Sequence, residues 1–190
     1  MQELIKRYQI KCLKILEVVM AGLTRKKNIK ESSENEALLK LVTFQLGAEL
    51  YGVEIMEVDQ IVRVQDVRPI PNAPYYVEGI FTLRSEIIPI ISLHKRFHIQ
   101  KAVFEDEDES LGGFVILKIE GNKMGIIIDR IARVVDVKKE DIQPPPEMIT
   151  GIGTEYIHGV VRREQGYLII LDIRKLFSSK ELQKLASVAV

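Results

Sequence analysis

Two histidines are the residues of this 190-residue sequence that most suggest a metal-binding site. His94 and His98 lie four positions apart, a spacing that places two imidazoles on one face of a helix. Two ligands do not complete a zinc site, and no cysteine or acidic residue is suitably placed nearby in the sequence to add the others. We therefore interpret both histidines as exposed polar residues on a short helix or loop, and we expect no metal site.

Other arrangements that carry catalysis are incomplete. Cys12 lies on the apolar stripe of a predicted helix, where a packed side chain is a better interpretation than a nucleophile. Residues 151–153 read Gly-Ile-Gly and lack the third glycine of a dinucleotide-binding loop. The acids at 105–109 predict a solvated loop, or alternatively a partner-binding patch, and not the buried cleft of acid–base catalysis. The sequence thus favours a protein that is not an enzyme and needs no cofactor.

Composition excludes several classes of partner. Hydrophobic residues make up 46% of the chain and charged residues 28%, and the formal net charge is zero. This balance is typical of a globular protein and argues against general nucleic-acid binding. A single cysteine cannot form an intramolecular disulfide, which fits a reducing cytoplasm. No apolar run reaches the ~20 residues of a membrane span, and no secretory signal is evident.

Residues 1–36 are predicted to form an amphipathic helix and a polar linker. From about residue 3 to residue 24, apolar side chains recur on one helical face. Residues 1–30 carry eight Lys or Arg against two acids, so this segment has a net charge of +6 and the remainder −6. The helix either packs on the rest of the chain or binds another helix, a receptor or an anionic membrane. The apolar stripe comprises Leu4, Ile5, Tyr8, Cys12, Ile15, Leu16, Val19 and Leu23.

The remaining sequence contains two similar copies. Residues 41–55 return 73 positions later, and residues 76–97 return 80 positions later as 156–177. The second copy therefore carries a seven-residue insertion between these blocks. Duplicated units of this kind usually form a pseudo-symmetric body.

Both copies are predicted to be rich in β-structure. Short runs of β-branched and aromatic residues alternate with glycine- and proline-rich turns, and Arg84-Ser85 is placed at a hairpin turn. Residues 54–62 fit either a strand or a short helix. We predict a mainly β fold of two small barrels in tandem, about 38–100 and 111–177, followed by a short C-terminal helix. A half of this size is marginally stable alone, so the halves should share buried apolar surface.

Several stretches resemble the CheW-type chemotaxis coupling proteins. In the first copy these are residues 51–55, 69–74 and 78–93, and the second copy adds 124–129, 134–137 and 167–173. The likeness runs from about residue 38 to residue 185. It implies a CheW-like domain at 37–185, built of two SH3-like five-stranded β barrels.

The resemblance also implies a function. Such proteins are non-catalytic adaptors that join the cytoplasmic tips of chemoreceptors to the regulatory domain of a histidine autokinase, in receptor arrays at the inner face of the membrane. The alternative is a divergent adaptor of a non-flagellar pathway, recruited to a receptor or membrane by its N-terminal helix. By motif position, the kinase-binding surface would include Val58, Gln60, Gly79 and Arg84, and the receptor-binding groove Gly125, Ile131 and Val134.

The family's asparagine-x-arginine-glycine signature is only partly kept. Arg84 is retained, but Thr82 and Ser85 stand in place of the asparagine and the glycine. Only glycine enters positive-φ turns freely, so the turn at Arg84 is expected to differ in shape. We also expect Val58→Asp to abolish kinase binding while the fold stays intact.

Overall fold

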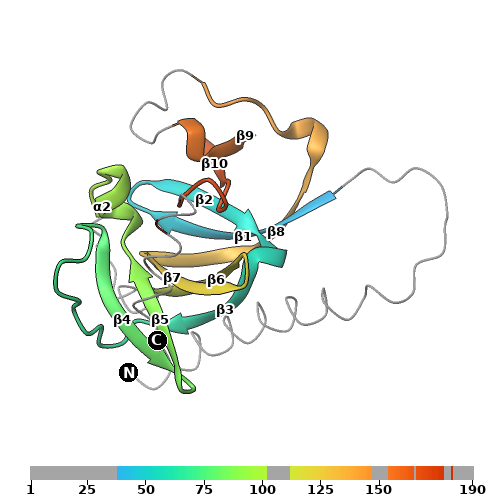
Figure 1. Cartoon of the computed structure of the whole chain (residues 1–190). Helices are drawn as coiled ribbons and strands as arrows, with labels where there is room; N and C mark the ends of the chain where they lie inside the picture. Colours follow the sequence, from blue (N-terminus) through green and yellow to red (C-terminus); the bar gives the residue numbers. More distant parts are fainter. Residues whose placement is uncertain (1–37, 102–111, 147–153, 165, 178–180, 182–190) are drawn as a thin grey trace, which may run out of the picture.

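The computed structural model describes residues 38–101, 112–146, 154–164, 166–177 and 181. The predicted N-terminal helix and linker, the acidic run, the Gly-Ile-Gly segment and all but residue 181 of the predicted C-terminal helix lie outside these ranges. The described residues contain ten strands and a few short helical turns (Figure 1).

The first sheet has five strands in the order β8-β1-β2-β10-β9. β1 and β2 form an antiparallel hairpin, and β8 pairs with the outer edge of β1. β10 runs parallel to β2 and antiparallel to β9. The strand bounds are Leu38–Leu46 for β1, Glu49–Glu54 for β2, Arg130–Lys138 for β8, Ile157–Arg163 for β9 and Gly166–Leu171 for β10.

The second sheet has the order β3-β6-β7-β5-β4 and repeats the same pattern, with β5 parallel to β7. Its strands are β3 (Val58–Arg63), β4 (Val77–Leu83), β5 (Glu86–Ile91), β6 (Gly113–Ile119) and β7 (Asn122–Ile128). The short helices are η2 (Ile55–Glu57), α2 (Leu93–Phe97), η4 (Lys139–Asp141) and η5 (Thr154–Tyr156). Within the segment 54–62, Glu54 ends β2, η2 forms a 3-10 turn, and β3 follows as a strand.

The two barrels are present, but each contains strands from both copies of the sequence. The first-copy hairpin β1-β2 completes the sheet of β8, β9 and β10, and the second-copy hairpin β6-β7 completes the sheet of β3, β4 and β5. The parallel pairs Ile170↔Gly52 and Ile90↔Gly125 are corresponding contacts of this exchange. The assignment of the barrels to 38–100 and 111–177 is therefore wrong.

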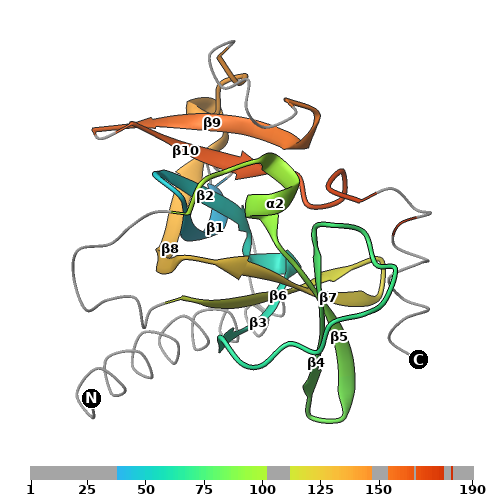
Figure 2. The same ribbon diagram turned by 90° about the vertical axis from the view of Figure 1, so that its left-hand side faces the viewer.

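The connections explain the exchange. η2 leads directly from β2 of the first sheet into β3 of the second, and Asp129 alone separates β7 from β8. Figure 2 shows the two sheets stacked, with β2, β9 and β10 above β6 and β7. Each chain copy therefore crosses between the layers after its first hairpin and cannot close a barrel alone.

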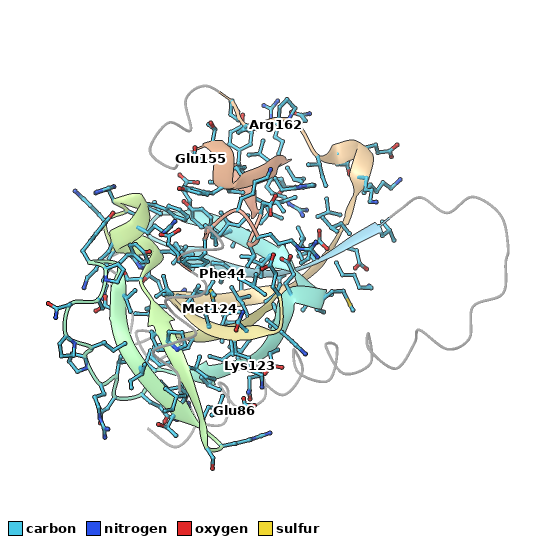
Figure 3. The ribbon with its side chains drawn as sticks, viewed as in Figure 1. Phe44, Glu86, Lys123, Met124, Glu155 and Arg162 are labelled. Atoms are coloured by element: carbon cyan, nitrogen blue, oxygen red, sulfur yellow. The ribbon has the colours of Figure 1, made fainter. Side chains whose placement is uncertain are left out.

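The largest hydrophobic core lies between the two sheets. It joins Phe44 and Tyr51 of the first sheet to Val115, Met124 and Ile126 of the second, and Figure 3 shows Phe44 and Met124 facing this central layer. Two smaller clusters, one around Leu168 and one around Phe114 and its sheet neighbours, fill the individual barrels. The prediction that the halves share buried apolar surface is confirmed.

Candidate interaction surface

The four residues predicted to bind a kinase lie on β3, on β4 and at the turn that follows β4. In the sheet order these two strands are the edges of the second sheet. Arg84 is exposed and Gln60 is partly exposed, whereas Val58 and Gly79 are buried. The structure therefore places all four in one barrel but leaves only two of their side chains accessible to a partner.

Val58 belongs to the core between the sheets. Its side chain is only 5% exposed, and its partner across the sheet is Leu117. An aspartate here would place a charge in an apolar interior, which costs several kcal/mol. The expectation that Val58→Asp leaves the fold intact is therefore wrong, and this substitution cannot test a contact surface.

Gly79 closes the second barrel by allowing two backbones to approach. It has a φ of 149°, and a Cβ at this position would collide with the carbonyl oxygen of Arg68. The next residue, Ile80, exchanges two 2.9 Å backbone hydrogen bonds with Arg68. Gly159 sits in the matching place of the other barrel, beside the Gln143–Val160 bridge. Close approach of the backbone thus explains the glycine in both copies.

The predicted turn at Arg84-Ser85 is confirmed as the connection between β4 and β5. Both residues have positive φ, 48° for Arg84 and 73° for Ser85, as a two-residue type I′ hairpin requires. Ser85 thus holds a conformation that glycine adopts freely, at a cost on the order of 1 kcal/mol. Both side chains are exposed, so this tip is available to a partner.

The residues predicted to bind a receptor are divided between the two sheets. Gly125 is buried in β7, where a Cβ would lie 2.6 Å from the Cδ1 atom of Ile90. Ile131 and Val134 lie on β8 of the other sheet; Ile131 is 2% exposed, and Val134 packs partly buried against the central core. Of the three, Val134 has the most accessible side chain.

An open groove on the second barrel escaped the sequence analysis. We call it the edge cleft: a cavity of about 840 Å³ lined by Val64, Gln65, Asp66, Val67, Arg68, Ile80, Phe81, Thr82 and Ile87. Val64 is 57% exposed. The apolar Val64 and Val67 within the otherwise polar stretch 63–68 were the available signal in the sequence.

The backbone of β4 is also open at Thr82, one residue along the strand from Phe81 in this cleft. Ile80 directs its N–H and C=O groups toward Arg68, and Thr82 directs its own to the same side because strand residues alternate. β4 is an edge strand in the sheet order, and the described strands pair Thr82 only with Ile87. The edge cleft therefore combines apolar side chains with backbone hydrogen-bonding groups, which is a surface suited to binding protein.

The two histidines do not converge. His94 is buried and its Nε2 lies 2.8 Å from the Oδ2 atom of Asp129, so its predicted exposure is wrong. His98 is exposed as predicted, with its ring 6.4 Å from that of Tyr75. Across the described ranges, no three His, Cys, Asp or Glu side chains form a cluster that could hold a metal ion. Nothing in the sequence indicated this contact, because Asp129 belongs to the second copy and His94 to the first.

Asp129 ties three segments together. Its Oδ2 atom also accepts the N–H of Gly47 at 2.7 Å, so it joins the β1–β2 turn, the β7–β8 connection and α2. Burial alone would raise the pKa of the Asp129 carboxyl, but the His94 and Gly47 hydrogen bonds outweigh it and hold the pKa below its usual range. The ionised carboxylate is therefore the form that the fold stabilises.

Acid is expected to remove this stabilisation. Because the folded-state pKa of Asp129 is lowered, its contribution is complete above the unfolded pKa of about 4 and is lost as the pH falls through the folded value. We expect Asp129→Asn to lower the free energy of unfolding by about 1–3 kcal/mol at pH 7 and by progressively less below pH 4. Urea unfolding at several pH values measures this difference. Asp136→Asn, which removes the exposed ion pair with Lys40, is the control; an equal, pH-independent loss in both variants would contradict the assignment.

Two exchanged β barrels with an open cleft at one barrel edge define a protein-binding module. Residues 40–181 match the CheW-like domain family, and the chain belongs to that family. It is 71% identical over 153 residues to the chemotaxis protein CheW of Treponema pallidum, covering 80% of this chain and 90% of that protein. It is 35% identical over 171 residues to the chemotaxis protein CheW of Klebsiella aerogenes, covering 90% of this chain and 98% of that protein.

A solved structure agrees with the fold. The scaffolding protein TtCheW from Thermoanaerobacter tengcongensis superposes with a TM-score of 0.69 at 32% identity, over 82% of this chain and 96% of that one. The resemblance seen in the sequence and the predicted pair of barrels are thus confirmed. In the part of the chain that the structure describes, no helix has both the length and the hydropathy needed to cross a bilayer.

Proposed function

We propose that this protein is a non-catalytic adaptor that couples chemoreceptors to a histidine autokinase in a chemotaxis-type signalling array at the inner face of the cytoplasmic membrane. The observation that carries this proposal is the edge cleft on a two-barrel body of the CheW-like family. The names of its relatives, chemotaxis protein and scaffolding protein, fit a role in assembly.

The kinase contact is assigned to the edge of the second barrel. Val64 and Thr82 of the edge cleft and Arg84 at the adjoining turn are exposed, and Gln60 on β3 is partly exposed. A regulatory domain with a similar barrel would cover the apolar side chains and bind the open backbone groups of Thr82 on β4. Two buried residues support this edge. Gly79 lets the backbones of Arg68 and β4 approach, and Val58 packs in the core between the sheets.

The receptor contact is assigned to the surface around β8. Val134 offers a partly exposed apolar side chain there, and Ile131 anchors the strand in the central core. Gly125 keeps β7 close to β5. The two partners would then bind on different sheets of the same molecule, which is what a coupling protein needs.

Binding to the kinase regulatory domain tests the first contact. We expect Val64→Lys and Arg84→Ala each to weaken binding by about tenfold or more, because they change exposed side chains at the proposed contact. Their folds should stay stable, since exposed substitutions usually change the free energy of unfolding by less than about 0.5 kcal/mol. Affinity is measured by calorimetry and stability by thermal unfolding.

Two further variants serve as controls. Tyr167→Lys alters a 38% exposed side chain on the other sheet and should leave kinase affinity unchanged. Ser85→Gly relieves the strained turn and should stabilise the fold by about 0.5–1 kcal/mol. If Val64→Lys and Arg84→Ala bind the kinase as well as the Tyr167 variant does, the contact lies elsewhere.

A further inference from the structure

A largely buried arginine lies at the joint between the two barrels. Arg96 lies on α2, which follows β5 of the second sheet, and its side chain is only 10% exposed. Burial of a guanidinium is costly unless other groups compensate for the lost water. Neither the predicted kinase contact nor the predicted receptor contact uses this residue.

Three aromatic rings and one carboxylate surround Arg96. Its guanidinium carbon lies 4.5 Å from the ring centre of Tyr76, 4.9 Å from that of Phe177 and 5.5 Å from that of Tyr156. All three distances are within the range of a cation–π interaction. Its Nη1 atom lies 3.3 Å from Oε1 of Glu181, and the Tyr76 hydroxyl donates to the same oxygen at 2.5 Å.

The surrounding residues come from both barrels. The carbonyl of Tyr76 accepts the N–H of Ser92 at 2.8 Å, next to α2, whereas the carbonyl of Tyr156 accepts the N–H of Asp172 at 2.8 Å, beyond β10. Each tyrosine is thus fixed to a different sheet. Phe177 also follows β10, so a single side chain from one barrel touches two rings of the other.

We propose that Arg96 is a positioning residue that fixes the two barrels relative to each other, and that Glu181 holds its guanidinium between the rings. The planar cation stacks on rings from both sheets, and the carboxylate neutralises it and accepts a hydrogen bond from Tyr76. Phe177 and Glu181, which follow β10 in the sequence, are thereby held against α2 of the other barrel. Lysine would keep the charge at position 96 but lose the planar stacking.

Hydrogen exchange in the full-length protein tests this arrangement. In Arg96→Met, the amides of Ser92 and Asp172, which donate to the two tyrosine carbonyls, should exchange about tenfold faster or more, while amides of the β6–β7 hairpin should keep their protection. Arg96→Lys should give a smaller increase. Lys95→Met removes the neighbouring exposed ion pair with Glu78 and should change neither amide. Equal acceleration of all slow amides, or no acceleration at Asp172, would overturn the proposal.

A second measurement isolates Glu181. Burial, aided by the Glu181 hydrogen bond, raises the pKa of Tyr76 to about 12. In Glu181→Gln this titration should move toward the ordinary tyrosine value of about 10, and the amide of Ser92 should lose protection. Ultraviolet titration against a Tyr76→Phe reference identifies the signal. An unchanged Tyr76 titration together with unchanged exchange at Ser92 would remove Glu181 from the joint.

Discussion

Replacing Phe44 by alanine is expected to lower the free energy of unfolding by about 3–5 kcal/mol. The side chain is fully buried in the core between the sheets, and its ring stacks on Tyr51 with centroids 6.4 Å apart. Alanine would leave a cavity where both barrels meet. Because each sheet contains strands of both copies, the loss should weaken the two barrels together.

Urea unfolding followed by circular dichroism and by hydrogen exchange measures this effect. We expect one cooperative transition in the wild type and in Phe44→Ala, with both sheets losing protection at the same denaturant concentration. Phe81→Ala, in the smaller cluster of the second barrel, is the matched variant and should also shift the single transition. Two separate transitions, or a β6–β7 hairpin that stays protected after β1–β2 has unfolded, would contradict a shared core.

The sequence predicted the content of the fold better than its connectivity. The 73- and 80-residue repeat lags, the hairpin at Arg84-Ser85 and the shared apolar surface follow from local patterns and from the size of each copy. The exchange of hairpins between the copies depends on where short connections such as η2 lead the chain, which is a property of the tertiary fold. β1 and β6 are corresponding strands of the two copies with similar sequences, so their local patterns do not say which sheet each one joins.

Motif positions led to the second barrel, but that their residues bind a kinase stays a prediction. The motif residues lie on β3, on β4 and at the turn after β4, whereas the cleft is lined by β4, by Ile87 of β5 and by residues 64–68 after β3. Motif positions did not separate residues that shape the barrel edge, such as Val58, from residues that present side chains there, such as Val64. The cluster around Arg96 could not be predicted from the sequence, because Tyr76 and Tyr156 come from different copies and Glu181 follows the last strand. Only the tertiary fold brings them together.

Gly79→Ala is expected to lower the free energy of unfolding by about 3 kcal/mol. A methyl group on this residue would collide with the Arg68 carbonyl, so the two hydrogen bonds between Arg68 and Ile80 would have to break. Losing the two backbone hydrogen bonds costs about 1–3 kcal/mol in all, and the positive φ of 149° adds roughly 1 kcal/mol for a residue with a side chain. Thermal or urea unfolding measures the total.

Gly121→Ala separates these two causes. Gly121 has a φ of 87°, but a Cβ there would meet no atom within 4 Å, so alanine should cost only the backbone strain of about 1 kcal/mol. If Gly79 instead contacted the kinase directly, its alanine variant would bind poorly while unfolding no more easily than the Gly121 variant. We expect instead that Gly79→Ala unfolds more easily than Gly121→Ala, because Gly79 acts by shaping the barrel edge. The affinity for the kinase should then fall together with the hydrogen-exchange protection of the Ile80 amide. A variant that keeps this protection should keep its affinity.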